Sequence, residues 1–254
     1  MTQRWIIVGV DCATQEAQLG LARAVLHASG ELELERVTLG TAGESAAASM
    51  SQWIGAHEHY VLAFDAPLGW PKALGATLAR HAAGEPLKAA EEKLFRRETD
   101  RLVHKHLRKL PPDVGADRVA RTSRAALDLL RDVRAHAGRP LPLAWKQGED
   151  PGVIEVFPAA TLLARGVTSI GYRANTPRAR NTRADILGRL AQEMAMRPTR
   201  DVIIDDINLF DASLCALAAA DFIRAECVNP ENQELAHKEG HIWFRASGQR
   251  DLFV

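Results

Sequence analysis

Short apolar runs, each closed by an acidic or a turn residue, mark the first part of the chain. Residues 5–10 form a continuous run with β-branched side chains, which is typical of a strand buried on both faces. Residues 18–26 and 32–39 have the length and composition of two more strands, with a turn at Ser29-Gly30 between them. The pattern therefore predicts a three-stranded meander.

A helix and a fourth strand follow the meander. Residues 44–55 are rich in alanine, which favours a helix, and residues 60–64 form a second strand of the buried type. Asp11 directly follows the first strand, and Asp65 directly follows the fourth. Because ligand sites of open α/β sheets lie beyond the carboxyl ends of the strands, we expect both aspartates at one edge of the sheet.

From about residue 72 to residue 137 the sequence changes to Ala, Leu, Arg, Lys and Glu with helical spacing. Pro111 and Pro112 divide this segment, because proline removes a helical hydrogen bond. The pattern predicts two or three helices. We therefore expect one α/β domain over residues 1–254, in which residues 72–150 are a helical insertion after the fourth strand.

The mixed α/β pattern resumes after the insertion. Residues 152–157 predict a short strand that contains Glu155, and residues 180–196 and 208–225 predict two helices. Residues 240–246 predict a terminal strand or a β-like tail. The two parts of the chain on either side of the insertion are therefore expected to build one sheet.

Composition excludes several classes of protein. The chain has 254 residues, of which 46% are apolar, so it can bury a sizeable core. The apolar-leaning run before Asp11 is too short for a signal peptide, and no stretch is long enough to span a bilayer. Cys12, Cys215 and Cys227 are odd in number and widely separated, which predicts neither a disulfide framework nor a zinc site. We expect a cytoplasmic protein with no membrane partner.

The charges balance, with 32 Lys and Arg against 32 Asp and Glu. The whole molecule therefore has no net field that would attract nucleic acid, and a site for a polyanion must be local. Residues 93–109 and 173–183 are the two basic segments that could supply one. The alternative for both is a solvated helix face and a polar loop.

Four carboxylates are the candidates for chemistry: Asp11, Asp65, Glu155 and Asp211. Helical spacing places Asp211 on the core-facing stripe of its helix. Because burial of an ionised carboxylate is costly, we expect a metal ion or a cationic side chain opposite it. The alternatives are turn or N-cap roles for the two strand-end aspartates, stabilisation of Asp211 by the helix dipole, and a solvated edge-strand position for Glu155.

Six short motifs occur in one order along nearly the whole chain, and together they resemble a known family. They are Gly9-Val10-Asp11, Asp65-Ala66-Pro67-Leu68-Gly69, Arg97-Glu98-Thr99-Asp100-Arg101, Glu155-Val156-Phe157-Pro158-Ala159-Ala160, Asp211-Ala212-Ser213-Leu214-Cys215-Ala216 and Glu239-Gly240-His241-Ile242-Trp243. The chain resembles the predicted ribonuclease H-fold nucleases known as domain of unknown function 429. That family often has Gly or Cys-Pro soon after its first aspartate, whereas Cys12-Ala13-Thr14-Gln15 follows here.

The resemblance implies a ribonuclease H-like mixed sheet flanked by helices, and it suggests metal-dependent cleavage of phosphodiester bonds in nucleic acid. Oxygen ligands suit Mg²⁺ or Mn²⁺, and two such ions about 3.5–4 Å apart can activate water and stabilise the leaving oxygen. In that reading Asp11 bridges the two ions, and Asp65, Glu155 and Asp211 complete their coordination shells. Arg97 and Arg101, one helical turn apart, would clamp a phosphate.

In the same reading Asp100 would orient one of these arginines. Two other functions stay open. One is an ATP-handling relative of the actin, Hsp70 and sugar-kinase type, although the first hairpin has Thr14 and Gly20 and no Gly pair. The other is a catalytically silent binding module of the same fold, in which the acidic cluster is residual.

Overall fold

The computed structural model describes residues 3–41, 43–115 and 117–246, and within them six strands form one mixed sheet. The strands are β1 (Trp5–Asp11), β2 (Gly20–Leu26), β3 (Leu32–Leu39), β4 (Tyr60–Asp65), β5 (Gly152–Glu155) and β6 (Ala195–Met196). Their order across the sheet is β5-β4-β1-β2-β3-β6. β1, β2 and β3 are an antiparallel meander, and β4 and β5 extend it in parallel from β1. This is the predicted ribonuclease H-like arrangement, and the predicted fold class is confirmed.

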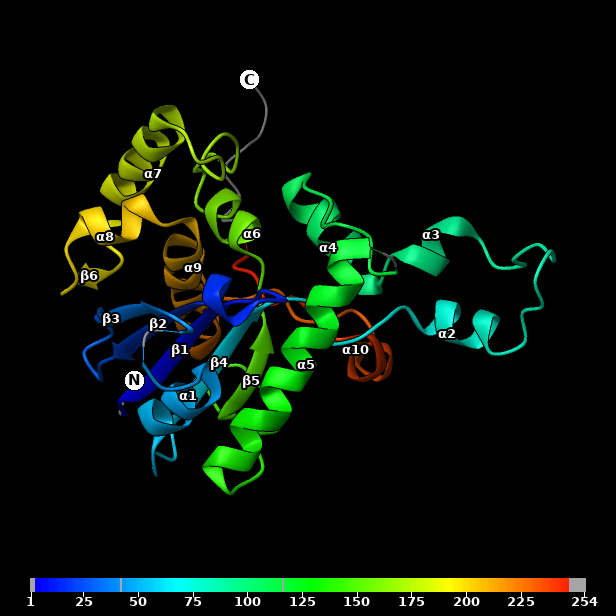
Figure 1. The fold of residues 1–254 in the computed structure, drawn as a ribbon, viewed down its shortest axis with the longest axis horizontal. Coiled ribbons are helices and arrows are strands. Elements are labelled where there is room, and N and C mark those ends of the chain that lie inside the picture. Colours follow the sequence, from blue (N-terminus) through cyan, green and yellow to red (C-terminus); the bar gives the residue numbers. More distant parts are fainter. Residues whose placement is uncertain (1–2, 42, 116, 247–254) are drawn as a thin grey trace.

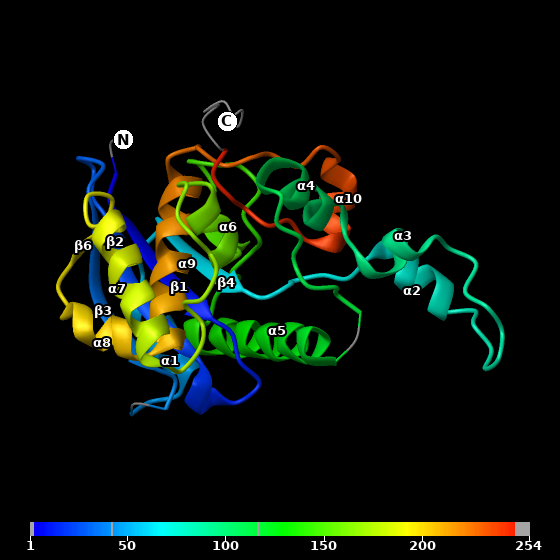
Figure 2. The same ribbon diagram turned by 90° about the horizontal axis from the view of Figure 1, so that it is seen from above.

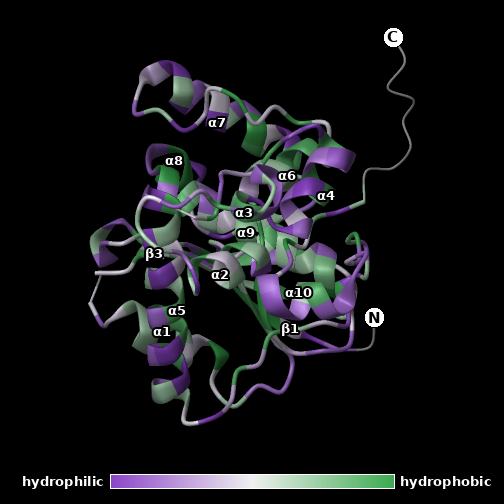
Figure 3. Ribbon diagram, turned by 90° about the vertical axis from the view of Figure 1, so that its right-hand side faces the viewer, coloured by the Kyte–Doolittle hydropathy of each residue, from purple (hydrophilic) through white to green (hydrophobic). Residues whose placement is uncertain are grey.

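Helices cover both faces of the sheet (Figures 1 and 2). The helices of the described residues are the short 3₁₀ helix η1 (Glu16–Gln18) and the α-helices α1 (Ala46–Ile54), α2 (Lys72–Leu78), α3 (Glu91–Phe95), α4 (Glu98–Leu107), α5 (Asp117–Ala137), α6 (Pro158–Leu163), α7 (Pro177–Leu190), α8 (Arg200–Asp205), α9 (Ile207–Ile223) and α10 (Gln233–Glu239). Hydrophobic segments gather in the interior around β1 and α9, and hydrophilic ones lie on outer helices such as α7 (Figure 3). None of the helices in the described residues is long and apolar enough to cross a membrane.

β1 is the central strand, and its side chains enter two cores. Ile6, Val8 and Val10 pack with apolar residues of α1 and α5 on one face of the sheet. Trp5 and Ile7 pack with the core of α9 on the other face. This division follows from the alternation of side chains along a strand, and it explains why residues 5–10 are apolar without interruption.

The contact of α9 with the sheet depends on two glycines. A Cβ atom at Gly9 would lie 2.1 Å from the carbonyl oxygen of Ala212, and one at Gly20 would lie 2.1 Å from the carbonyl oxygen of Asn208. Glycine therefore lets the backbone of α9 approach β1 and β2 more closely than any other residue would. This approach brings the second turn of α9 over the carboxyl end of β1.

The insertion holds more helices than the sequence predicts. Its described residues form α2, α3, α4 and α5, where two or three helices were expected. Pro111 and Pro112 do separate α4 from α5, as predicted. The additional break falls at Arg96 and Arg97, whose backbone is extended between α3 and α4. In both views α2 and α3 project away from the body, whereas α5 lies along the sheet (Figures 1 and 2).

Several short elements were not predicted, namely α6, α8, α10 and β6. The three helices are seven residues or shorter, which is too short to show a helical period, and β6 has only two residues, too few to show the alternation of a strand. The β-like tail was predicted correctly. Ile242 bridges to Glu155 and Arg245 bridges to Cys227. The assignment of all 254 residues to one domain stays a prediction.

Candidate metal centre

Three carboxylates converge at the edge of the sheet. Asp11 and Asp65 are partners in the parallel register of β1 and β4, and both stand at the last position of their strands. Asp211 comes from the second turn of α9, on the face that packs on β1. One carboxylate oxygen from each residue lies within 4.8 Å of those from the other two. This spacing allows one metal ion to bind all three, and among the described residues no other group of this kind is found.

The electrostatics of the group favour a bound cation. Burial raises the pKa of Asp11 well above its usual value, and the charges of Asp65 and Asp211 raise it further. Burial raises the pKa of Asp65 to about 7, against the opposing effect of Arg173. Burial likewise raises the pKa of Asp211 to about 6, although Arg173 and a hydrogen bond from Tyr172 lower it. Three carboxylates in this position repel one another, and a divalent cation would relieve that repulsion.

Arg173 supplies a positive charge to the group from the protein itself. Its Nη2 atom lies 2.9 Å from a carboxylate oxygen of Asp211 and 3.6 Å from one of Asp65. Its Nε atom donates to the hydroxyl of Tyr172 at 3.0 Å, and that hydroxyl donates to the other oxygen of Asp211 at 3.0 Å. The side chain of Arg173 is 53% exposed, so it has room to leave the carboxylates.

The loop that carries Tyr172 and Arg173 is anchored by a buried arginine of α7. Arg183 is 3% exposed and donates to the carbonyl oxygens of Tyr172 at 2.6 Å and of Ile204 at 2.5 Å. Arg183 thus fixes the backbone at Tyr172. In the sequence, Arg173 and Arg183 stand out only as members of a basic segment, and no pattern marks Tyr172.

Glu155 does not join the three aspartates. It is 3% exposed on β5, and both of its carboxylate oxygens accept hydrogen bonds from Arg97, at 2.7 and 2.8 Å. One oxygen also accepts from the backbone N–H of Leu68 at 2.9 Å, in the loop that follows Asp65. The role of Glu155 as a fourth metal ligand stays a prediction, because its ion pair with Arg97 would have to open before Glu155 could bind an ion.

The guanidinium group of Arg97 also binds groups of the protein itself. Its Nη1 and Nη2 atoms donate to Glu155, while Nε and Nη2 donate to Asp100 and Nη1 also donates to the carbonyl oxygen of Glu239. A guanidinium group has five N–H donors, and these contacts use all of them. The expected orientation of Arg97 by Asp100 is present, but Arg97 has no donor left for a phosphate.

Arg101 also departs from the expected phosphate clamp. Its side chain is exposed and donates to the carbonyl oxygens of Arg96 and Glu92, at 2.9 and 3.4 Å. It does not line the pocket that Arg97 lines. Arg101 lies in the first turn of α4, whereas Arg97 is the extended residue that precedes this helix, and only Arg97 is directed inward.

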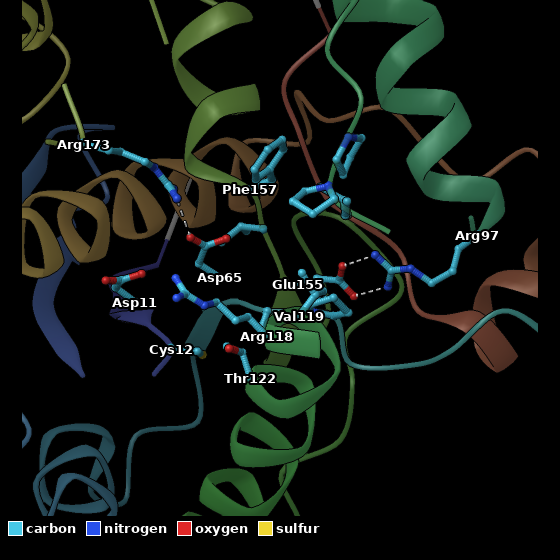
Figure 4. A pocket seen from close by; sticks show the side chains of 16 residues that line it. Asp11, Cys12, Asp65, Arg97, Arg118, Val119, Thr122, Glu155, Phe157 and Arg173 are labelled. Carbon is cyan, nitrogen blue, oxygen red and sulfur yellow. Dashed lines mark hydrogen bonds and ion pairs between the residues drawn. The ribbon is translucent and has the colours of Figure 1, made fainter. Parts of the chain in front are cut away.

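A pocket of about 230 Å³ opens beside Asp11 and Asp65 (Figure 4). Its wall combines residues of the strand ends with residues of the insertion, including Pro111, Pro112, Arg118, Val119 and Thr122. The insertion therefore flanks the carboxylates. Arg118 extends from α5 toward Asp11 and Asp65 (Figure 4). Sequence analysis missed Arg118 and Thr122, because helical spacing alone does not show which part of the sheet α5 covers.

Solved structures share a loose similarity with the chain. The structure of RuvC from Thermus thermophilus is 14% identical, with a TM-score of 0.33, over 87% of this chain and 95% of that protein. The yeast mitochondrial Holliday junction resolvase Ydc2 is 7% identical, with a TM-score of 0.36, over 86% of this chain and 82% of that protein. At these TM-scores the fold assignment rests on the strand order and register.

No curated protein matches the sequence of this chain. The resemblance found from the six sequence motifs is, however, confirmed independently. Residues 9–235 match the family described as "Protein of unknown function (DUF429)", and the chain belongs to that family.

Proposed function

We propose that the protein is a metal-dependent nuclease that hydrolyses phosphodiester bonds of nucleic acid at Asp11, Asp65 and Asp211. The observation that carries the proposal is the convergence of these three carboxylates within 4.8 Å at the carboxyl edge of the sheet. Oxygen donors of this kind fit Mg²⁺ or Mn²⁺ and suit softer metals poorly. A bound ion would lower the pKa of a water molecule and neutralise charge on the phosphate.

Different residues of the protein would bind the ion and the phosphate. Asp11 and Asp65, fixed by the register of β1 and β4, would hold the ion at the strand ends, and Asp211 would hold it from α9. Arg173 is paired with Asp211 and Asp65, and its half-exposed side chain would be able to bind a phosphate of the substrate instead. The resemblance to the family implies two ions. The three aspartates are ligands for the first, and a second would share Asp11.

The compartment we propose is the cytoplasm. Cys12, Cys215 and Cys227 are free thiols, and burial raises the pKa of each of them. A reducing environment keeps such thiols unpaired.

The metal site is tested first by thermal unfolding with and without Mn²⁺. An ion at one hundred times its Kd adds about 2.7 kcal/mol to the free energy of unfolding. For a chain of this size, that should raise Tm by about 5–10 °C. The Asp11→Asn variant should lose this shift, because Asn keeps the shape of Asp and removes a charged ligand. Asp132→Asn, a change at an exposed carboxylate of α5, is the matched control and should keep it.

The nuclease activity is tested on single-stranded and double-stranded DNA and RNA with Mg²⁺ or Mn²⁺. We expect cleavage by the wild-type protein and at least a hundredfold loss in Asp11→Asn, because removal of a metal ligand removes the charge that stabilises the transition state. Mn²⁺ binding that depends on Asp11 without cleavage of any of these substrates would leave a metal-binding module. Absence of a Mn²⁺ shift in the wild type would overturn the metal site itself.

A further inference from the structure

The pocket beside the carboxylates has a second feature that the proposed function does not explain. Its wall away from Asp11 holds the apolar side chains of Phe157, at the N-cap of α6, and Val119, on α5, beside the paired Arg97 and Glu155 (Figure 4), and Pro111 and Pro112 before α5 also line the pocket. Phe157 is only partly buried, although it packs against the small core formed by α4, α6, Ile242 and Phe244. A metal site that bound only a phosphate would not need an apolar wall next to it.

A cation stands between this wall and the carboxylates. Arg118 is exposed, lies in the first turn of α5, and forms no ion pair within the described residues. It points toward Asp11 and Asp65 across the pocket (Figure 4). Thr122 follows one helical turn later on the same face and also lines the pocket. Two arginines of the insertion, Arg97 and Arg118, line the pocket. All donors of Arg97 are used within the protein, so Arg118 is the one that can bind a phosphate beside the metal site.

The size of the pocket limits what can enter it. At about 230 Å³ it is smaller than the roughly 300–1,000 Å³ of pockets that enclose a whole drug-sized molecule. It can take a phosphate together with the base or sugar next to it, but it is too small for a double helix. In a duplex the base faces are stacked and hidden, so only an unpaired nucleotide can place a base against Phe157 and the two prolines.

We propose that the site recognises an unpaired nucleotide of DNA or RNA, with its phosphate held by Arg118 next to the carboxylates and its base against Phe157. This rests on the proposed function, because the phosphate must lie where the metal ion acts. Arg118 supplies the electrostatic part of binding, which weakens as salt rises. Phe157 supplies a stacking surface that accepts any base and depends little on salt.

The proposal is tested by binding of fluorescein-labelled oligonucleotides in Ca²⁺, measured by fluorescence anisotropy. The probes are a 12-nucleotide single strand of DNA, the same strand in RNA, and the blunt DNA duplex. We expect both single strands to bind at least tenfold more tightly than the duplex. Arg118→Ala should weaken binding of the single strands about tenfold and reduce the salt slope by about one. Arg124→Ala, the same change at an 84% exposed arginine of the same helix, should have neither effect.

Phe157 is tested by two variants, because its ring also packs against a core. Phe157→Leu should weaken binding of the single strands about tenfold and leave the salt slope unchanged. Phe157→Tyr keeps the ring and should bind like the wild type, which separates stacking from a folding defect. Each variant's Tm without nucleic acid is measured alongside.

Two results would overturn the proposal: a duplex bound as tightly as the single strands, or equal losses in Arg118→Ala and Arg124→Ala. The proposed function fails on a different measurement, the Asp11-dependent shift of Tm by Mn²⁺. If that shift is present and the single strands are not preferred, the metal site stands and the unpaired-nucleotide site is wrong. If single-strand preference depends on Arg118 while Mn²⁺ has no effect, the binding site stands and the metal-dependent reaction is wrong.

Discussion

At the scale of single residues, Arg173 is paired with the carboxylate oxygens that the proposed metal ion would bind, so the two would compete. Arg173 lies 2.9 Å from Asp211, and Asp211 accepts a further hydrogen bond from Tyr172. An arginine in this position stabilises the aspartates when no ion is bound, and it must release them when one enters. Its presence explains how a buried acidic group can be tolerated in the folded protein at all.

We expect Arg173→Gln to bind Mn²⁺ more tightly than the wild type. Loss of the competing charge should lower the Kd for Mn²⁺ about tenfold, which corresponds to about 1.4 kcal/mol. The same change should lower the Tm of the metal-free protein, because Asp65 and Asp211 lose their counter-charge. Titration calorimetry and thermal unfolding measure the two effects. Weaker binding of Mn²⁺ by the variant would show that Arg173 does not compete with the ion.

At the scale of elements, the site depends on how closely α9 lies on the sheet. Gly9→Ala tests this, because the added Cβ would meet the Ala212 carbonyl oxygen at 2.1 Å and the backbone nitrogen of Ala216 at 2.6 Å. α9 would have to move away, and Asp211 with it. We expect a loss of about 1–3 kcal/mol in the free energy of unfolding and a loss of the Mn²⁺ shift. Gly75→Ala in α2 meets no atom within 4 Å and is the control.

The ion pair of Arg97 and Glu155 joins α4 of the insertion to β5, and we expect it to be structural. Glu155→Ala should lower the free energy of unfolding by about 3–5 kcal/mol, because Arg97 would be left buried with Asp100 as its one remaining acidic partner. A double-mutant cycle with Arg97→Met should show strong coupling between the two residues. The Kd of the folded Glu155→Gln protein for Mn²⁺ should equal that of the wild type. A large loss of Mn²⁺ affinity there would instead make Glu155 a metal ligand.

At the scale of the whole molecule, the raised pKa values predict how stability changes with pH. Burial raises the pKa of Asp65 to about 7 and that of Asp211 to about 6, above the usual value of 3.8 for aspartate. The folded protein therefore holds these protons more tightly than the unfolded chain. The stability that protonation of Asp65 and Asp211 contributes to the folded state is fully present below about pH 4, and it is lost as the pH rises through 6 and 7.

We expect the Tm of the metal-free wild type, taken relative to the Tm of Asp65→Asn at the same pH, to fall between pH 5 and pH 8. The comparison removes the effect of all other titrating groups. The Asn variant cannot ionise at this position, so its Tm should depend less on pH over the same range. Mn²⁺ should reverse the trend, because it binds the ionised carboxylates. Identical pH profiles for the wild type and Asp65→Asn would contradict the raised pKa of Asp65.

Much of the fold could be predicted from the sequence, because its strands and main helices are long and regular. Residues 5–10 are a short apolar run with β-branched side chains, and residues 208–225 are a longer apolar segment rich in Ala and Leu, so length and composition favour a strand for the first and a helix for the second. The positions of Asp11 and Asp65 at strand ends followed from the same pattern. Asp211 could be recognised because a carboxylate on a core-facing stripe needs a partner.

Other features were decided by the tertiary structure alone. Glu155 has the same chemistry as the aspartates, but its contact is set by Arg97, which lies 58 residues away in the chain. Arg118 and Arg173 are two of many arginines in the sequence, and only the positions of α5 and of the loop before α7 bring them to the carboxylates. The hydrophobic pattern of a segment reports whether a residue faces a core, which is a local property. The pairing of charged side chains depends on how whole helices and strands are placed relative to one another. No local period in the sequence encodes that placement.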